Sequence, residues 1–413
     1  ALLEKDIPQG HKEATLASAL WESIREEVRK DYISIFERSW PGWLAGIFLA
    51  ILALLIFMWH SPWGITGGYR NWGDWILYGL RLSPERPTLP WLSGMSMSNL
   101  GLLAGALASA LMSRQFRIRP APPYEYLKGL AGGALMGTGA ALAAGCNIGG
   151  FYNAVAMFSM GGYAMMIGLG AGAYLGLRFL LWELNNFPQQ AAGPPPTQDL
   201  KKEPLVNWSR LSPFIGGAIL IMILAAFYIF SAQGHTQIGG LLFFGALIGI
   251  TMHRSRMCFV RAFREPFMTG DAEMIRVIAM SLMIYGLGSA VIKWNYLQPD
   301  IMGVYHPFWF GSLTGGIVFG FGMLLAGGCG TGALWRAGEG HTKLMLTLIA
   351  FSVSNSLGFK FLNNTGLADK LGSGTFMPAV FGWELAMPLY MLIMLAWVVW
   401  GIWNEKTEKF VIF

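Results

Sequence analysis

A series of long apolar stretches with few charges most limits what this chain can fold into. Hydrophobic residues make up 54% of the 413 residues and charged residues only 13%, against roughly 25% charged in soluble domains. A helix needs about 20 apolar residues to cross the hydrocarbon core of a bilayer. The sequence therefore predicts an all-α polytopic membrane protein, and it excludes a cytosolic enzyme, a nucleic-acid-binding protein and a disordered chain. We expect about ten Gly-rich transmembrane or broken helices, at Trp43–Trp59, Met95–Met112, Leu127–Gly145, Met160–Leu181, Pro213–Ser231, Ile238–Met252, Glu273–Ile292, Phe310–Gly328, Leu344–Phe361 and Phe381–Trp403.

Two polar segments divide the chain. In residues 1–40 apolar side chains recur every four positions, which predicts an amphipathic helix on the membrane or on the transport domain; a solvated helix that packs on nothing is the alternative. These apolar positions are Leu16, Leu20, Ile24, Val28, Tyr32 and Phe36. Residues 185–212 contain three consecutive prolines and predict a stiff polar linker. The two membrane halves would then be residues 41–184 and 213–413.

The distribution of Lys and Arg predicts the orientation in the membrane, because cytoplasmic loops are enriched in both. If all ten stretches cross and the N-terminus is cytoplasmic, the outer loops carry mainly Arg70, Arg81, Arg86, Lys293 and Lys370. Many more basic residues then fall in the inner loops: Arg29, Lys30, Arg38, Arg114, Arg117, Arg119, Lys201, Lys202, Arg210, Arg254, Arg256, Arg261, Arg264, Lys406 and Lys409. We therefore expect both termini to be cytoplasmic.

The chain repeats itself around two of its three cysteines. When Gly129–Gly149 is placed over Ser312–Gly332, a shift of 183 residues, ten of 21 positions are identical. Convergence of two Gly-rich packing helices is the alternative, but packing alone does not require a matched Gly-Cys-x-x-Gly. The identical pairs are Leu130/Leu313, Gly132/Gly315, Gly133/Gly316, Gly137/Gly320, Gly139/Gly322, Leu142/Leu325, Ala143/Ala326, Gly145/Gly328, Cys146/Cys329 and Gly149/Gly332.

A second, weaker similarity indicates how the two copies are oriented. Gly105-Ala-Leu107 matches Gly245-Ala-Leu247 with a shift of 140 residues, so the second half carries an insertion between its two matches. The insertion contains Cys258 and one additional apolar stretch. Because one extra crossing reverses direction, the Cys146 helix should run outward and the Cys329 helix inward. We therefore expect an inverted repeat with its substrate site near the midplane.

The repeated motif suits an anion. A helix interrupted at Gly145-Cys146-x-x-Gly149 or Gly328-Cys329-Gly330-x-Gly332 leaves backbone N–H groups free, and a helix N-terminus is partly positive. A thiol is mostly neutral at pH 7 and is a weak, soft donor that passes an anion along without trapping it. Three cysteines without a Cys-x-x-Cys pair argue against a disulfide framework and a zinc site.

At these residues the sequence resembles the YeeE/YedE family of sulphur-transport membrane proteins. The similar stretches are Ala144-Gly-Cys-Asn-Ile-Gly-Gly150, Arg256-Met-Cys-Phe-Val-Arg-Ala-Phe-Arg264, Leu325-Ala-Gly-Gly-Cys-Gly-Thr-Gly332 with Trp335-Arg-Ala-Gly-Glu-Gly340, and Gly64-Ile-Thr-Gly67 in the first outer loop. The similarity covers about residues 43–403, with residues 1–40 as an extension outside it. It implies an hourglass-shaped channel in the bacterial inner membrane that relays thiosulfate between Cys146, Cys258 and Cys329. It also implies a soluble sulphur-carrier partner of the TusA type.

Several polar residues near the motifs have two interpretations. Arg336 and Glu339 lie three apart on one helix and form either a gate beside Cys329 or a structural ion pair. Asn147 either donates to substrate or caps the backbone. His253 and His341 lack metal-ligand spacing, so we expect no metal site and no cofactor. Apart from the substrate anion, the expected contacts are membrane lipid and the carrier protein, with no nucleic acid.

Three other functions stay open. The first is transport of a selenium compound, which the motifs do not separate from thiosulfate uptake. The second is a membrane thiol oxidoreductase, which needs a pair of cysteines able to cycle a disulfide. The third is a membrane anchor subunit, suggested by the amphipathic N-terminus. A transporter remains the leading hypothesis.

Overall fold

The computed structural model describes residues 25–187 except residue 28, together with 208–295 and 307–412. These residues form helices joined by short loops, with isolated bridges and no β-strand among them. The long helices are α2 (Gly42–Trp59), α4 (Gly94–Met112), α5 (Pro123–Leu142), α7 (Met160–Asn186), α9 (Trp208–Ala232), α10 (Thr236–Ser255), α12 (Glu273–Asn295), α13 (Phe310–Ala326), α15 (Thr342–Asn364) and α16 (Met377–Thr407). Each of the ten apolar stretches thus lies on a helix.

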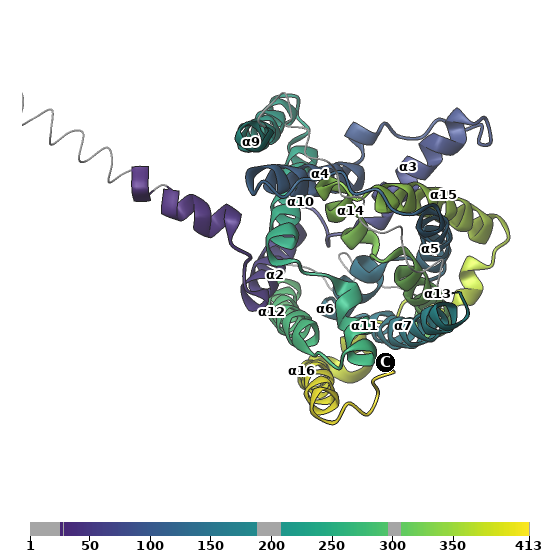
Figure 1. The fold of residues 1–413 in the computed structure, drawn as a ribbon. Helices are drawn as coiled ribbons and strands as arrows, with labels where there is room; N and C mark the ends of the chain where they lie inside the picture. Colours follow the sequence, from purple (N-terminus) through teal and green to yellow (C-terminus); the bar gives the residue numbers. More distant parts are fainter. Residues whose placement is uncertain (1–24, 28, 188–207, 296–306, 413) are drawn as a thin grey trace, which may run out of the picture.

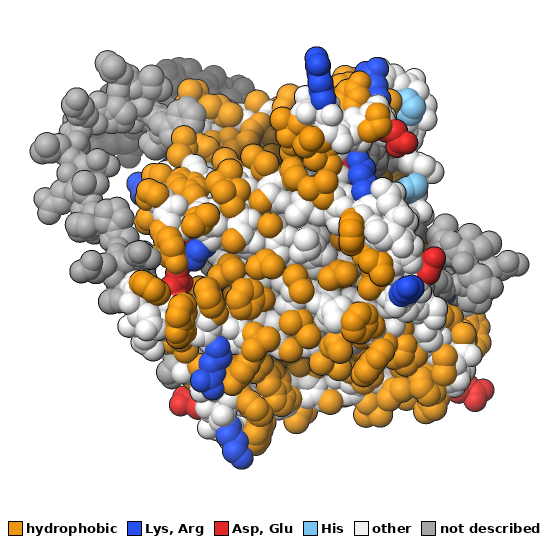
Figure 2. Space-filling model, turned by 90° about the vertical axis from the view of Figure 1, so that its right-hand side faces the viewer, with side chains coloured by type: hydrophobic (Ala, Val, Ile, Leu, Met, Phe, Trp, Pro, Cys, Tyr) orange, Lys and Arg blue, Asp and Glu red, His pale blue; other side chains and the backbone are white. Residues whose placement is uncertain are grey.

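The described part of the chain has nine helices long and apolar enough to cross a membrane, and α5 with the segment after it is a bent tenth. Large apolar side chains such as Ile167, Leu175, Ile221 and Leu392 are exposed along these helices. Hydrophobic side chains cover most of the face in Figure 2. An apolar outer surface of this kind is what lipid contact requires, so the all-α polytopic prediction is confirmed.

Shorter helices lie between the long ones. They are α3 (Thr66–Gly79), α11 (Phe259–Met268), α14 (Gly330–Glu339), and η3 (Asn147–Asn153) with its continuation α6 (Ala154–Ala156). Figure 1 shows α6, α11 and α14 toward the middle of the molecule, surrounded by the long helices. The sequence placed the start of α3 in an outer loop and Cys258 between two crossings, because these helices are too short and too polar to stand out by hydropathy. The remaining elements are η1 (Ile33–Glu37), η2 (Pro90–Leu92) and η4 (Ala368–Leu371).

Glycines bring α5 and α13 into close antiparallel contact. A Cβ added at Gly132 would lie 2.6 Å from the Gly322 carbonyl oxygen, and one at Gly139 would lie 2.7 Å from the Gly315 carbonyl oxygen. The 183-residue shift converts the first contact into the second, since it maps Gly132 onto Gly315 and Gly139 onto Gly322. The two contacts are therefore equivalent under the sequence shift.

The same shift relates a second pair of interfaces. Gly133 and Gly137 on α5 pack against the backbone of α15, near Thr347 and Phe351. Their counterparts Gly316 and Gly320 on α13 pack against the backbone of α7, near Met165 and Leu169. In both interfaces the paired helices run parallel. Small residues of this kind allow close helix packing in a membrane without help from the hydrophobic effect.

The weaker similarity between α4 and α10 has another explanation. Gly101 and Gly105 contact the backbone at Leu242 and Ala246, and Gly245 and Gly249 contact the backbone at Ser98 and Leu102. The two helices run side by side in the same direction, so their common glycine pattern is accounted for by packing against each other.

Both described ends of the chain lie at one end of the helices. Tyr32 donates to the carbonyl oxygen of Met112 at the end of α4, and Arg276 at the start of α12 pairs with Glu405 near the end of α16. Leu16, Leu20, Ile24 and Val28 of the expected apolar stripe, and most of the 185–212 linker, lie outside the described residues.

Candidate substrate pathway

Two interrupted helices form the core of the candidate site. After α5, Ala144 adopts a left-handed conformation with φ 53°, and the chain turns by 46° into η3 and α6. After α13, Gly327 adopts the same conformation with φ 78° before α14 begins. The 183-residue shift maps Ala144 onto Gly327, so both helices are interrupted in the same way at the same place.

Cys146 and Cys329 are the residues at which these two second segments begin. Their backbone angles are nearly identical, φ −84° and ψ −171° for Cys146 and φ −82° and ψ −179° for Cys329. Cys146 Sγ accepts from the Ile148 N–H at 3.4 Å, and Cys329 Sγ accepts from the Gly332 N–H at 3.4 Å. Both thiols are fully buried. Each sulphur therefore lies at the partly positive N-terminus of a short helix.

Cys258 joins Cys329 but belongs to another element. It precedes α11, and its side chain interacts with that of Cys329. A Cβ added at Gly332 would lie 3.3 Å from Cys329 Sγ and 3.7 Å from Cys258 Sγ, so both thiols line one space. All three cysteines are free thiols.

The start of α3 connects Cys146 with Cys329. The Thr66 hydroxyl accepts from the Cys146 N–H at 3.1 Å, and the Tyr69 hydroxyl donates to the Gly330 carbonyl oxygen at 2.7 Å. Tyr69 is buried, with its ring centroid 4.4 Å from that of Phe351. The two cysteine segments therefore meet around one helix end.

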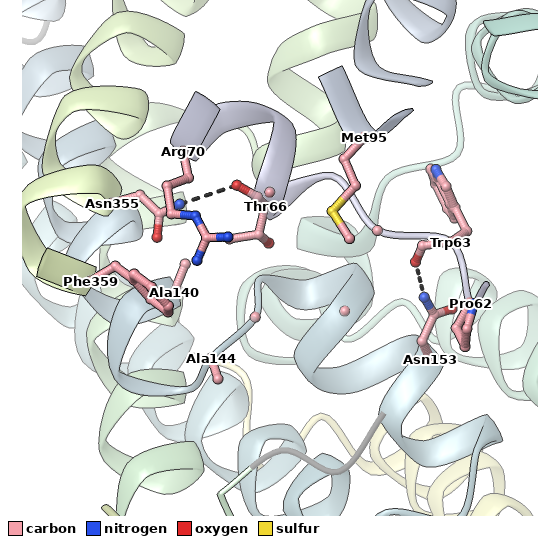
Figure 3. Close-up of a pocket in the computed structure, with 14 residues that line it drawn as sticks. Pro62, Trp63, Thr66, Arg70, Met95, Ala140, Ala144, Asn153, Asn355 and Phe359 are labelled. Carbon is pink, nitrogen blue, oxygen red and sulfur yellow. Dashed lines mark hydrogen bonds between the residues drawn. The ribbon is translucent and has the colours of Figure 1, made fainter. Parts of the chain in front are cut away.

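A cavity of about 200 Å³ (Figure 3) is lined by Gly145, the residue directly before Cys146. Its polar side chains are those of Thr66, Arg70, Asn153 and Asn355, and Gly145 and Gly149 contribute backbone. A Cβ added at Gly149 would meet nothing within 4 Å. The other lining residues are Pro62, Trp63, Gly64, Gly67, Met95, Ala140, Ala144 and Phe359.

Asn147 is buried and does not cap the backbone. Neither its amide nitrogen nor its carbonyl oxygen has a hydrogen-bond partner among the described residues. An unpaired buried amide costs about 1–3 kcal/mol. The substrate-contact interpretation of Asn147 therefore remains, and the capping alternative loses its support.

A charged cluster lies at the opposite end of α4 from the cavity. Glu339, 1% exposed, accepts from Arg256 at 2.7 Å and pairs with Arg119 at 3.0 Å. Its second oxygen lies 3.7 Å from His341 Nε2, and Arg256 also donates to the Gln115 side chain at 2.6 Å. Burial opposes ionisation, but the hydrogen bond and charge of Arg256, with Arg119 beside it, hold the pKa of Glu339 well below its ordinary value. The carboxylate thus ties the end of α14 to the segments after α4 and α10.

The structural ion pair, one of the two interpretations of Arg336 and Glu339, does not form between these residues. Arg336 instead donates to the Gly327 carbonyl oxygen at 2.9 Å and lies over the ring of Trp335 at 5.1 Å. The spacing of three placed the two residues on one helix, but Arg256 and Arg119 reach the carboxylate from other elements. Among the described residues, no three His, Cys, Asp or Glu side chains gather where they could hold a metal.

Thr66, Tyr69, Arg70 and Asn355 lie at the candidate site, where sequence reasoning did not place them. The resemblance at Gly64-Ile-Thr-Gly67 was the available signal, because it marked the start of α3. Asn355 on α15 carried no motif. Its amide donates to the Thr66 carbonyl oxygen at 3.2 Å, which joins α15 to the same helix end.

In the described part of the chain, nine membrane-capable helices and a bent tenth define a polytopic membrane protein of the kind that builds channels and transporters. Comparison with known proteins identifies its family. The chain belongs to the sulphur-transport family, whose model matches residues 12–175 and 254–411. Because the match begins at residue 12, the expectation that residues 1–40 lie outside the family is wrong for most of that segment.

Curated relatives of the chain are named as transporters, and the protein is a transporter rather than an enzyme. It is 28% identical to the "Probable transporter YedE" of Escherichia coli over 293 residues, 68% of this chain and 70% of that protein. It is 31% identical to the "Thiosulfate transporter TsuA" of Escherichia coli over 113 residues, 27% of this chain and 32% of that protein. Its identity with the TsuA of Spirochaeta thermophila is 35% over 107 residues, 24% of this chain and 30% of that protein. No solved structure matches the chain significantly.

Proposed function

We propose that this protein carries thiosulfate, or a closely related sulphur anion, across the bacterial inner membrane through a path lined by its three cysteines. The anion enters the cavity beside Arg70, passes Cys146 and leaves past Cys329 and Cys258. Gly145, Asn147, Gly149, Gly328, Gly330 and Gly332 provide backbone and amide contacts along the path. The observation that carries this proposal is the pair of buried thiols at the N-termini of two matching short segments, η3 with α6 and α14, which we call half-helices.

Chemistry supports a soft anion as the cargo. Each half-helix N-terminus attracts negative charge, while a neutral thiol donates weakly and matches a polarisable sulphur atom better than a hard oxygen. A chain of weak sites permits both binding and release, as in ion channels. Arg336 and Glu339 act near the inner end, where Arg336 draws the anion and Glu339 holds the end of α14.

We also propose that the halves 41–184 and 213–413 form an inverted repeat around these cysteines. The glycine contacts that map onto themselves and the antiparallel course of α5 and α13 support a two-fold axis in the membrane plane. With the basic residues on the cytoplasmic side, the chain ends and the Glu339 cluster are cytoplasmic and the Arg70 cavity opens outward. The described part of the N-terminal segment lies at this proposed cytoplasmic end, where Tyr32 contacts α4.

Uptake of labelled thiosulfate into proteoliposomes tests the proposed function. Selenite, sulfite and sulfate serve as competitors. Saturable uptake that unlabelled thiosulfate inhibits at a lower concentration than selenite does supports sulphur transport. Inhibition by selenite at the lower concentration would instead favour the selenium alternative. No uptake of labelled thiosulfate would contradict thiosulfate transport by this protein alone.

The thiol-oxidoreductase alternative predicts a behaviour of the same thiols that transport does not need. Cys258 and Cys329 line the same space, as a redox pair would. Mild oxidation followed by non-reducing electrophoresis separates the two functions, because a redox enzyme must cycle this pair through a disulfide during turnover. A transporter that keeps full flux with both thiols reduced excludes the redox function.

A soluble sulphur carrier of the TusA type is the proposed cytoplasmic partner. It would receive the anion or its sulphur at the inner end, beside the basic residues that follow α10. Co-purification of a carrier with the full chain, lost when Arg261 and Arg264 are replaced by Gln, would support this partner. Equal co-purification of the carrier with the wild-type chain and with the Arg261 and Arg264 variant would contradict docking at this surface.

A further inference from the structure

The cavity beside Cys146 carries a chemical selectivity that the thiols do not explain. Among the described residues that line it, Arg70, on the first turns of α3, is the single Lys or Arg, and none is Asp or Glu. Arg70 also has no carboxylate partner within 4.0 Å in the described part of the chain. A cavity with one unneutralised guanidinium favours an anion.

The environment of Arg70 fixes the plane of its guanidinium. The group lies 4.1 Å from the centre of the Phe359 ring on α15. Stacking on an aromatic ring leaves the edges of a guanidinium free to donate. Figure 3 shows Arg70, Asn355 and Phe359 on one side of the cavity and Met95 and Asn153 on the other.

The cavity is large enough for a hydrated oxyanion. Water occupies roughly 30 Å³ per molecule in the liquid, so about 200 Å³ holds a small anion and some water. Asn153, 1% exposed, donates its amide to the Trp63 carbonyl oxygen but leaves Oδ1 without a partner among the described residues. A buried amide oxygen of this kind calls for water, which agrees with a wet vestibule.

We propose that Arg70 captures the oxygen end of the substrate and thereby turns its terminal sulphur toward Cys146. This inference rests on the proposed function and names the residue that orients the anion at its first binding site. The forked N–H groups of the guanidinium match two oxygens of a sulfonate-like group. Gly145 and Gly149, which lie close to Cys146 in the chain, line the same cavity. The cavity thus binds the oxygen end of the anion, and the cysteine thiols further along the proposed path bind its terminal sulphur.

The proposal predicts that sulfate, which has oxygens but no soft sulphur, competes at Arg70 without being carried. Arg70→Gln should raise KM for thiosulfate and weaken inhibition by sulfate, each by about tenfold or more, because a hydrogen bond to a charged group is lost. Arg70→Lys keeps the charge but loses the fork and should fall between. Phe359→Leu should raise KM for thiosulfate only a few-fold, because it removes the ring that holds the plane of the guanidinium but leaves Arg70 in place.

The matched control is Arg86→Gln, which removes the same charge from an exposed position that does not line the cavity. Thermal stability of each variant checks that folding is retained. Cys146→Ser provides a second comparison: it should lower thiosulfate flux but leave the sulfate inhibition constant unchanged. Equal KM and equal sulfate inhibition in Arg70→Gln and Arg86→Gln would overturn the proposal.

Calorimetric titration separates this inference from the proposed function. Solubilised protein is titrated with thiosulfate and with sulfate, with no transport step involved. If the wild type binds either anion and Arg70→Gln binds it about tenfold more weakly, Arg70 is the oxyanion site even where uptake fails. If binding is unchanged by the substitution, the Arg70 proposal fails while thiosulfate transport can still hold.

Discussion

Cys258 and Cys329 reach the same space from elements that are far apart in the sequence, and Gly332 leaves that space open. A methyl group at Gly332 would lie 3.3 Å from Cys329 Sγ and 3.7 Å from Cys258 Sγ. The thiols thus act as a pair at one half-helix, while Cys146 stands at the other with Thr66 as its neighbour.

Gly332→Ala should strongly reduce thiosulfate flux with little loss of folded protein. Its methyl group enters the space between the two thiols, whereas the nearest contact of 3.3 Å requires only a small shift of a side chain. Gly217→Ala on α9 is the matched control, since its Cβ would meet nothing within 4 Å. Equal flux in the two variants would show that substrate does not pass this space.

Side chains of increasing size at Gly149 test the half-helix that begins at Cys146. Gly149→Ala places its methyl group where nothing lies within 4 Å, so stability should hold, and flux should fall moderately. Gly149→Leu should nearly abolish flux, because a larger side chain fills the cavity. Flux and thermal stability are measured together; a Leu variant that is folded and transports normally contradicts a path beside Gly149.

The glycine contacts of α5 and α13 should matter equally on both sides of the proposed two-fold axis. Gly132→Ala and Gly315→Ala each place a Cβ 2.5–2.6 Å from backbone of the facing helix. Overpacking of this kind costs about 1–3 kcal/mol. Thermal unfolding of both variants in detergent should give similar losses, and a large loss in only one would contradict equivalent environments.

Glu339→Gln should loosen the contact between α14 and the segments after α4 and α10. The substitution leaves Arg119 and Arg256 without their carboxylate, at a cost of about 1–3 kcal/mol because both arginines are partly exposed. Thermal unfolding measures the loss. In a double-mutant cycle with Arg256→Gln, the two effects should be less than additive; full additivity would show that the pair does not interact.

Hydropathy and the internal repeat predicted most of the architecture, because bilayer thickness sets the length of an apolar helix and each half-helix carries its own motif. The contacts of Glu339 could not be predicted in this way. Arg256 lies 83 residues before it in the chain, and only the packing of α10 against α14 brings the two together. The Arg70 cavity was missed because α3 is short and polar, and its partners on α15 carry no recognisable pattern.

Flux of labelled thiosulfate through proteoliposomes containing Cys329→Ser tests the central claim most directly. Serine keeps nearly the same size and still donates a hydrogen bond, but its oxygen is harder and matches the terminal sulphur poorly. The account predicts wild-type abundance and thermal stability with flux reduced about tenfold or more, which corresponds to about 1.4 kcal/mol of lost interaction between the soft thiol and the terminal sulphur. Wild-type flux through a correctly folded Cys329→Ser protein would contradict the cysteine-lined path.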